Sequence, residues 1–374
     1  MAKKQNYLGV DIGGGSLKVV ELKPVGNRPQ LVTYGYVDES YNIIKDDTPE
    51  ARQEIANHLR ELLKQSRVTS SRAVSALPSF SVFSSIINLP AMARKDLISA
   101  VRWEAKKFVP IPLEEMILDW EVLKEPGQII PGSRTDDNKE KDSKVKDNKT
   151  ADKEAEPETA KGNLKVLLTA APKNLVNRYV ELFKEVGLQL VGLETESFAL
   201  ERSLVGNDLS PVMVVDLGSR SISIIIFSAG VPTLNRSIDV GGRSVTKGLA
   251  EAMGLSELQA EQYKRDMSIS LEKEPLEKLP RPVAYLINSL INEMRYILNI
   301  YQNQSRQPIS KVIVTGGSCF VAGLTDYIYN IFNIKAFIGD PWARVIHPVD
   351  IDAMLKELGP RFAVSVGLAM REIV

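Results

Sequence analysis

Two stretches of the chain repeat the same alternation of apolar and polar positions. Residues 7–22 read YLGVDIGGGSLKVVEL, and residues 212–227 read VMVVDLGSRSISIIIF. Each predicts an apolar strand that ends in an aspartate, a glycine turn, and a returning strand with alternate apolar positions. The hairpin is therefore an internal repeat, one copy in each half of the chain. The aligned pairs are Asp11 with Asp216, Gly13 with Gly218, and Ser16 with Ser221.

The rest of the chain alternates between helix and strand periodicity. Helices are predicted within 49–65, 93–108, 173–186, 198–204, 239–253, 256–267, 282–301, 321–332 and 361–373. Further strands are predicted at 30–38, 72–77, 82–89, 116–123, 164–170, 188–194 and 311–314. The helix at 282–301 has the clearest apolar seam and is expected in a core. Its seam consists of Leu286, Leu290, Met294, Ile297 and Tyr301.

This order of elements predicts an α/β protein with two lobes. We assign residues 1–78 and 195–210 to the first lobe, 79–194 to an inserted α+β subdomain, and 211–374 to the second lobe, with a helical subdomain at about 241–305. Within the insert, residues 132–162 mix charges of both signs and lack aromatic side chains. That composition predicts a disordered loop, with a docking tail for a charged partner as the alternative.

Composition narrows the function classes. The 374 residues fit two or three domains of ~150 residues. Basic and acidic residues balance at 47 each, so no nucleic-acid partner is expected. The single cysteine, Cys319, cannot form an intrachain disulfide and is expected to be a small packing residue. The sequence shows no signal core and no run of ~18 apolar residues, which predicts a cytoplasmic protein that reaches a membrane only through a partner.

The first glycine turn is a candidate phosphate site. Its three glycines can take positive φ without a Cβ clash, so the turn can direct backbone N–H groups at an anion. They are Gly13, Gly14 and Gly15. Asp11 is placed to hold hydrated Mg²⁺ beside the phosphates, and Ser16 and Lys18 share one face of the returning strand. The alternative is an ordinary strand–turn–strand hairpin, which the second copy makes less attractive.

Other candidates follow the second hairpin. The turn that ends at Gly242 is followed by a helix. Its backbone could contact a phosphate at the helix N-terminus, or it could be a plain tight turn. Glu261 and Lys264 are three apart on one helix face, so they either hold a ribose or pair with each other. The strand–Gly316–Gly317–helix pattern lets a flat ring approach the backbone closely.

A catalytic base is harder to find. Glu194 or Glu196 could orient an attacking water, but an acid favoured by a helix start explains them at least as well. Glu196 is the weak catalytic candidate that we retain.

Five motifs, in order, carry a family resemblance: DIGGGSLKVVEL, VVDLGSRSISIIIF, DVGGRS, AEQYK and VTGGSCFVAGL. The chain resembles the actin and sugar-kinase ATPase superfamily, which implies the actin-like two-lobed ATPase fold, a duplicated RNase H-like core, here with the inserted small subdomain. Within it the chain most resembles the PilM family of type IV pilus assembly proteins, relatives of the division protein FtsA.

The resemblance implies ATP and Mg²⁺ as ligands. Asp11 and Asp216 would serve the metal, and Glu261 and Lys264 the ribose. The implied phosphate contacts are Gly13, Gly14, Gly15, Ser16, Lys18, Gly218, Ser219 and Gly242, and the implied adenine contacts are Gly316, Gly317 and Ser318. Arg220 and Ser221 stand where vigorous members have a glycine–threonine pair, so hydrolysis is expected to be slow or absent.

The resemblance also implies a partner, the N-terminal cytoplasmic tail of a PilN-like inner-membrane protein. Contacts with pilus motor ATPases and self-association are left open. The tail could add a strand at Ile86, Ile87 and Leu89, with Trp103 and Phe108 as a pocket, or these residues are core. Two rival functions are an FtsA-like division protein, which would carry a terminal amphipathic helix, and a kinase of the same fold, which would need a base aimed at a substrate hydroxyl.

Overall fold

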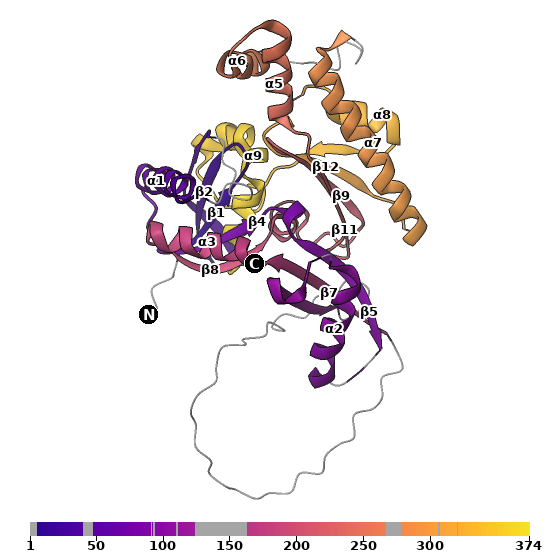
Figure 1. Ribbon diagram of the computed structural model, residues 1–374. Helices are drawn as coiled ribbons and strands as arrows, with labels where there is room; N and C mark the ends of the chain where they lie inside the picture. The colour runs from indigo at the N-terminus through magenta and orange to yellow at the C-terminus, as the bar shows by residue number, and fades with distance from the viewer. Residues whose placement is uncertain are drawn as a thin grey trace, which may run out of the picture. The chain divides into compact units, whose positions relative to one another are not determined.

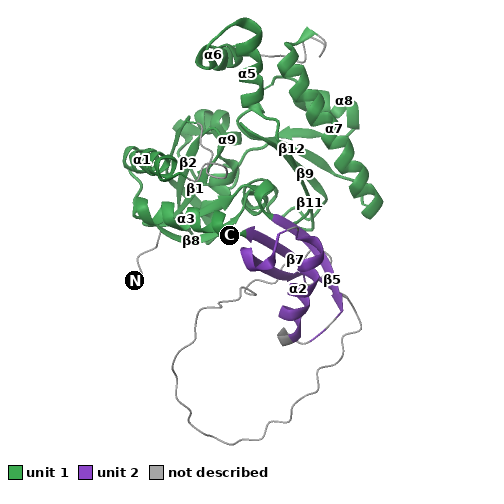
Figure 2. Cartoon of the chain, in the orientation of Figure 1, with its two compact units in different colours: residues 1–82, 172–374 green, residues 83–171 purple. Residues whose placement is uncertain are grey.

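The structure is a computed structural model that describes residues 6–39, 48–90, 92, 94–109, 111–123, 163–266, 278–305, 307–319 and 321–374. The predicted loop at 132–162 lies outside these residues. The chain divides into two compact units, residues 1–82 with 172–374 and residues 83–171 (Figure 2). Each unit has its own sheet structure and core, and we describe them in turn.

The first lobe of the larger unit is built on a five-stranded sheet in the order β3-β2-β1-β4-β8. The hairpin of β1 and β2 is antiparallel, β3 continues the meander, and β4 and β8 add in parallel on the other side of β1. The strands are β1 (Tyr7–Ile12), β2 (Leu17–Val25), β3 (Arg28–Val37), β4 (Arg72–Leu77) and β8 (Gln189–Thr195). Two long helices belong to this lobe, α1 (Pro49–Gln65) and α3 (Lys173–Val186).

The second lobe repeats that sheet with a new sequence. Its order is β11-β10-β9-β12-β13, again an antiparallel meander followed by two parallel strands (Figure 1). The strands are β9 (Val212–Leu217), β10 (Ile222–Ser228), β11 (Val231–Ile238), β12 (Lys311–Thr315) and β13 (Ala336–Ile338). The internal repeat seen in the two hairpins therefore extends to whole sheets, and the two-lobed α/β architecture predicted from sequence is confirmed.

Helices complete the second lobe. They are α5 (Gly242–Met253), α6 (Glu257–Asp266), α7 (Arg281–Gln304) and α8 (Leu324–Phe332). The capping box predicted for α6 is present, because Ser256 Oγ accepts the backbone N–H of Gln259 at 3.2 Å while Gln259 Oε1 accepts that of Ser256 at 3.0 Å.

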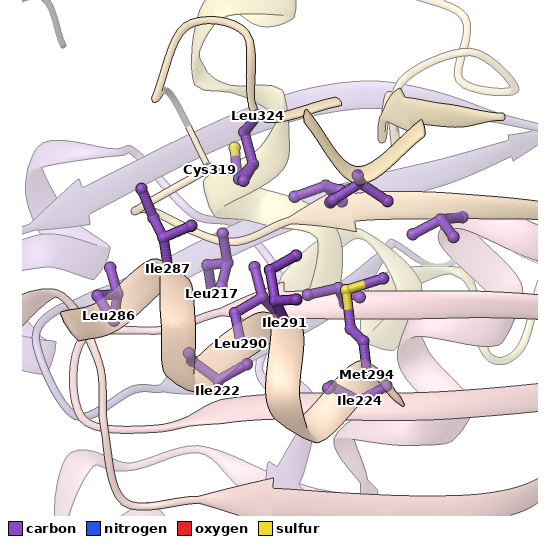
Figure 3. Close-up of a cluster of buried hydrophobic side chains, with 14 of the residues drawn as sticks. Leu217, Ile222, Ile224, Leu286, Ile287, Leu290, Ile291, Met294, Cys319 and Leu324 are labelled. Atoms are coloured by element: carbon purple, nitrogen blue, oxygen red, sulfur yellow. The ribbon is translucent and has the colours of Figure 1, made fainter. Parts of the chain in front are cut away.

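The core of this lobe lies under α7. Figure 3 shows Leu286, Leu290 and Met294 of α7 in one cluster of buried side chains with Ile222 and Ile224 of β10. All five residues of the predicted α7 seam are buried, and Cys319 packs among the same apolar groups with 1% of its surface exposed. Burial raises the pKa of the Cys319 thiol to about 12, so it behaves as an apolar side chain, as predicted.

The helix α9 (Asp352–Met370) begins nine residues before the predicted start at 361. Pro360 lies inside it, and the Pro360 carbonyl accepts the Gly316 N–H at 3.0 Å and the Thr315 hydroxyl at 2.9 Å. A proline normally argues against a helix interior, and the carbonyl of this one connects α9 to the end of β12. A short α4 (Glu196–Leu200) and a π-turn (Glu201–Val205) lead into the second lobe, where one helix was predicted at 198–204.

The smaller unit is a three-stranded sheet, in the order β5-β7-β6, with one long helix. Its elements are β5 (Phe83–Pro90), α2 (Arg94–Phe108), β6 (Met116–Leu123) and β7 (Asn163–Pro172). It is narrower than the predicted insert of 79–194, because β8 pairs with β4 and thereby joins the first sheet together with α3. None of the helices described in either unit is long and apolar enough to cross a bilayer.

Candidate functional site

The first candidate turn holds a buried ion pair. Asp11 and Lys18 lie opposite each other in the β1–β2 register, and Lys18 Nζ donates to Asp11 Oδ2 at 2.9 Å. Their side chains are only 9% and 11% exposed. The Gly13 N–H donates to the Ser16 carbonyl at 3.0 Å and closes the turn. The sequence predicted that these residues bind a phosphate and its metal, and in the structure they lie together at one end of the hairpin.

The second turn has the same backbone and a different charge. The Gly218 N–H donates to the Ser221 carbonyl at 3.0 Å, as in the first turn. Asp216, however, lies opposite Ser223, whose hydroxyl is within 2.9 Å of that of Ser237. Burial, followed by the nearby negative charge of Asp11, raises the pKa of Asp216 to about 6.

The two turns touch. Arg220 of the second turn donates through Nε to the Gly14 carbonyl of the first at 3.1 Å. A Cβ added to Gly15 would lie 2.5 Å from the Cβ of Ser219, so only glycine fits there. The predicted phosphate loops of the two lobes are thus adjacent, which is the arrangement needed to hold one ligand from both sides.

Glu196 belongs to the same acidic group. Its Oε2 accepts the backbone N–H of Ser79 at 2.9 Å. The pKa of Glu196 is raised to about 8. Desolvation is the largest cause, and the negative charges of Asp216 and Asp11 add to it. At neutral pH the carboxyl is therefore mostly protonated and can donate a hydrogen bond, and a nearby cation would lower its pKa and favour the form that accepts a proton from water.

Glu194, the other acid considered as a base, is a structural residue. Its carboxylate pairs with Arg202 and lies 3.5 Å from the Arg371 guanidinium, with only 8% of the side chain exposed. These arginines hold Glu194 in place between α9 and the π-turn.

The acidic group contains the two aspartates predicted to hold the metal. Among the described residues no three His, Cys, Asp or Glu side chains form a ready cage for an ion. Magnesium is commonly held by one or two carboxylates and keeps its remaining waters. Asp11 and Asp216 fit that mode, because each carboxylate raises the cost of charge on the other and a cation between them would offset it.

The predicted ribose residues are joined by a network around the start of α5. Lys264 Nζ donates to Glu261 Oε2 at 2.6 Å, to Thr246 Oγ1 at 2.9 Å and to the Gly242 carbonyl at 3.3 Å. Glu261 and Lys264 thus pair with each other on the face of α6 that meets the start of α5. Desolvation raises the pKa of Glu261, but the hydrogen bonds from Lys264 and Thr246 outweigh it, and the net pKa is lowered.

The glycines after β12 complete the group. Gly316 has φ of +92°, and a Cβ there would lie 2.5 Å from the Leu217 carbonyl oxygen and overlap the Asp216 carboxylate. The Ser318 N–H donates to the Leu217 carbonyl at 3.0 Å. A Cβ on Gly317 would lie 3.8 Å from Arg361 Nε. The predicted adenine residues therefore adjoin the second phosphate turn.

Three residues that the sequence did not reveal join the lobes beside this group. Asp38, just after β3, forms ion pairs with Arg361 of α9 and, at 3.2 Å, with Arg265 of α6. The Arg361 guanidinium also lies over the ring of Tyr36, 4.7 Å from its centroid. Because Asp38 is more than 220 positions from either arginine, no local pattern connects them.

A sequence model of one family spans this whole arrangement. The model described as type IV pilus assembly protein PilM matches residues 9–133 and 152–373. The chain belongs to the PilM family.

Comparison with known proteins agrees with this PilM-family assignment. The chain is 24% identical to the cell division protein FtsA of Borreliella burgdorferi over 180 residues, and 23% identical to FtsA of Escherichia coli K12 over 207 residues. These alignments cover 42% and 47% of the chain and 42% and 49% of the two FtsA proteins, so the match spans a little under half the length of either relative.

Solved structures give the fold. A structure of a PilM-PilN type IV pilus biogenesis complex matches with a TM-score of 0.79 and 25% identity over 100% of both chains. The ethanolamine utilization protein EutJ of Carboxydothermus hydrogenoformans matches with a TM-score of 0.52 and 14% identity, covering 98% of this chain and 90% of EutJ. MreB5 of Spiroplasma citri bound to ADP matches with a TM-score of 0.50 and 12% identity, covering 98% of this chain and 96% of MreB5.

Proposed function

We propose that this PilM-family protein binds ATP with Mg²⁺ where the two glycine turns meet. The observation that carries the proposal is the contact of the duplicated turns, which brings Asp11, Lys18 and Asp216 into one charged group. When bound, the metal would supply positive charge to the phosphates. Asp11 and Asp216 would hold its water shell, Lys18 would balance charge, and the backbone of Gly13–Gly15 would receive phosphate oxygens.

The rest of the nucleotide would lie along the second lobe. Glu261 and Lys264 would contact the ribose from α6, and Gly316, Gly317 and Ser318 would leave room for the base. The phosphates would be contacted from the second lobe by Gly218, Ser219 and Gly242, and from the first lobe by Ser16. Support comes from the actin-like ATPase fold, in which a relative such as MreB5 has been seen with ADP.

Hydrolysis would be slow. Glu196 is mostly protonated at neutral pH, since burial raises its pKa to about 8. We therefore propose a nucleotide-binding scaffold rather than a rapid enzyme, in which Mg²⁺ would lower the Glu196 pKa and so increase the fraction able to act on a water.

The partner that we propose is the N-terminal cytoplasmic tail of a PilN-like inner-membrane protein, which would hold the chain at the cytoplasmic face of that membrane. Support comes from the family match and from the similar chain in a PilM-PilN complex. In the smaller unit Ile87 and Leu89 are core residues, but Trp103 is 64% exposed and Phe108 is 47% exposed. We place the tail at the surface that carries Trp103.

A nucleotide titration tests the first proposal. Purified protein should bind ATP in the presence of Mg²⁺, and Asp11→Asn, which keeps the shape of the side chain, should bind it at least tenfold more weakly when measured by calorimetry. Arg236→Ala, on β11, serves as the control and should bind normally. Unchanged binding by Asp11→Asn would remove the first turn from the site.

A peptide titration tests the second. Synthetic N-terminal peptides of a PilN-like protein should bind saturably at micromolar concentration, and Trp103→Ala should weaken that binding. Tyr285→Ala removes an equally exposed aromatic ring from α7 of the larger unit, and it should leave the affinity unchanged. Equal affinities for all three proteins would move the tail away from α2.

A further inference from the structure

The two copies of the repeat differ at a position where the two turns meet. When Asp11 is aligned with Asp216 and Ser16 with Ser221, Gly15 falls opposite Arg220. The first turn thus has the smallest residue where the second has one of the longest. Since the backbone hydrogen bonds of the two turns are alike at 3.0 Å, the difference lies in the side chain alone.

The Arg220 side chain extends onto the first turn. Its Nε donates to the Gly14 carbonyl at 3.1 Å. A Cβ on Gly14 would lie 2.6 Å from Arg220 Cδ and 2.7 Å from Cγ, so the glycine makes room for the arginine. The guanidinium therefore reaches from the second lobe to the main chain that is proposed to bind phosphate.

A second cation lies nearby on a fixed backbone. Arg243 is the second residue of α5, and its N–H donates to the Ser219 carbonyl at 2.8 Å, directly beside Arg220. Desolvation, followed by the positive charge of Arg243, lowers the pKa of Arg220, and Asp239 opposes that shift. The Arg243 guanidinium also lies 3.7 Å from Glu257. Two neighbouring guanidinium groups at a turn favour an anion with several negative oxygens.

We propose that Arg220 binds the terminal phosphate of a nucleoside triphosphate while it keeps its contact with Gly14, and that it thereby distinguishes a triphosphate from a diphosphate. The inference rests on the proposed nucleotide site and assigns its phosphate specificity. The planar fork of a guanidinium matches the oxygens of a phosphate, and the bond from Nε holds the Arg220 fork on Gly14. Binding of the third phosphate would hold the two turns together, and a diphosphate would leave that contact unmade.

The test compares ATP with ADP. Calorimetry with Mg²⁺ at fixed ionic strength would give the dissociation constants of the wild type, Arg220→Gly, Arg220→Lys and the control Arg236→Ala. Arg236 also belongs to the second lobe, pairs with Glu293 at 2.7 Å and lies on β11. Thermal melts would establish that each variant is folded. Arg220→Gly restores the residue type of the first turn, and Arg220→Lys retains the charge if the glycine variant fails to fold.

We expect Arg220→Gly to weaken ATP at least tenfold and ADP less than threefold. Arg220→Lys should fall between, and Arg236→Ala should match the wild type. Hydrogen exchange of residues 13–16 should slow on addition of ATP to the wild type and change little in Arg220→Gly. Equal losses for ATP and ADP, or none, would overturn the assignment of Arg220 while leaving the nucleotide site standing. A wild type that binds neither nucleotide would overturn the site itself, and this inference with it.

Discussion

The two hairpins have the same backbone turn and differ in the residue that lies opposite the repeated aspartate. In the first, Asp11 faces Lys18 and the pair is buried at 2.9 Å. In the second, Asp216 faces Ser223, and burial raises its pKa to about 6. One strand position, two residues after the repeated serine, therefore decides whether the hairpin supplies a cation of its own to its aspartate.

The comparison teaches that a duplicated fold need not carry a duplicated site. The two turns have the same closing hydrogen bond, from the backbone N–H of the repeated glycine to the carbonyl of the repeated serine, at 3.0 Å in both. The residues between and after them then give each turn its own charge. The first turn carries its own cation in Lys18, and the second brings Arg220 to the first.

The largest effect should follow from breaking the buried pair. Lys18→Met leaves Asp11 buried without its cation, which should lower the free energy of unfolding by about 3 to 5 kcal/mol. Urea denaturation measures the loss. Ser223→Ala, at the matching position of the second hairpin, should cost about 1 kcal/mol or less. Similar losses in the two variants would show that the hairpins do not differ as described.

A glycine after β12 should come next. Gly316→Ala adds a Cβ at φ of +92° against the Asp216 carboxylate and the Leu217 carbonyl, so we expect a loss of about 2 to 3 kcal/mol in a thermal melt. Gly254→Ala is the matched control. It also has positive φ, at +67°, but nothing lies within 4 Å of the added Cβ, so about 1 kcal/mol is expected. A control that costs as much would mean that crowding by Asp216 is unimportant.

The pH dependence should separate Asp216 from Asp11. Folding raises the Asp216 pKa from 3.8 to about 6, so the folded protein binds this proton more tightly than the unfolded chain. The resulting stability is present below about pH 4 and is lost as pH rises to about 6, at about 1.4 kcal/mol per unit of pKa difference at most. Asp216→Asn should flatten this part of the stability curve.

Two further variants sharpen that test. Glu196→Gln should flatten the fall in stability that continues toward pH 8, since folding raises the Glu196 pKa from 4.5 to about 8. Ser223→Lys copies the first hairpin into the second and should lower the Asp216 pKa. An unchanged profile in Asp216→Asn would place the pH dependence elsewhere.

The smallest effect should come from the ion pairs that join the lobes. Asp38→Asn removes the charge that pairs with Arg265 and Arg361, whose side chains are 52% and 19% exposed. We expect a loss of about 0.5 to 1 kcal/mol at low salt and less at 1 M salt, because exposed pairs are screened. Chemical denaturation at both salt concentrations measures it, and a salt-independent loss would point to packing against Tyr36 instead.

Much of the fold could be read from the sequence because its signals are local. The apolar alternation of the hairpins, the seam of α7 and the capping box at Ser256 each depend on residues a few positions apart. Predictions of element and domain boundaries were less accurate where they depend on contacts between segments far apart in the sequence. The predicted start of α9 was too late because Pro360, which locally argues against a helix interior, lies within the helix, and the predicted insert was too wide because β8 pairs with β4.

By itself, the sequence determined the repeated hairpins, their glycine turns and the family to which those motifs point, since each is written in contiguous residues. Only the tertiary structure decided which charges meet. It placed Arg220 on Gly14, Asp38 between Arg265 and Arg361, and Glu196 beside two aspartates. The reason is physical: burial and charge depend on distances in space, and residues such as Arg220 and Gly14, 206 positions apart, come together only when both lobes have folded.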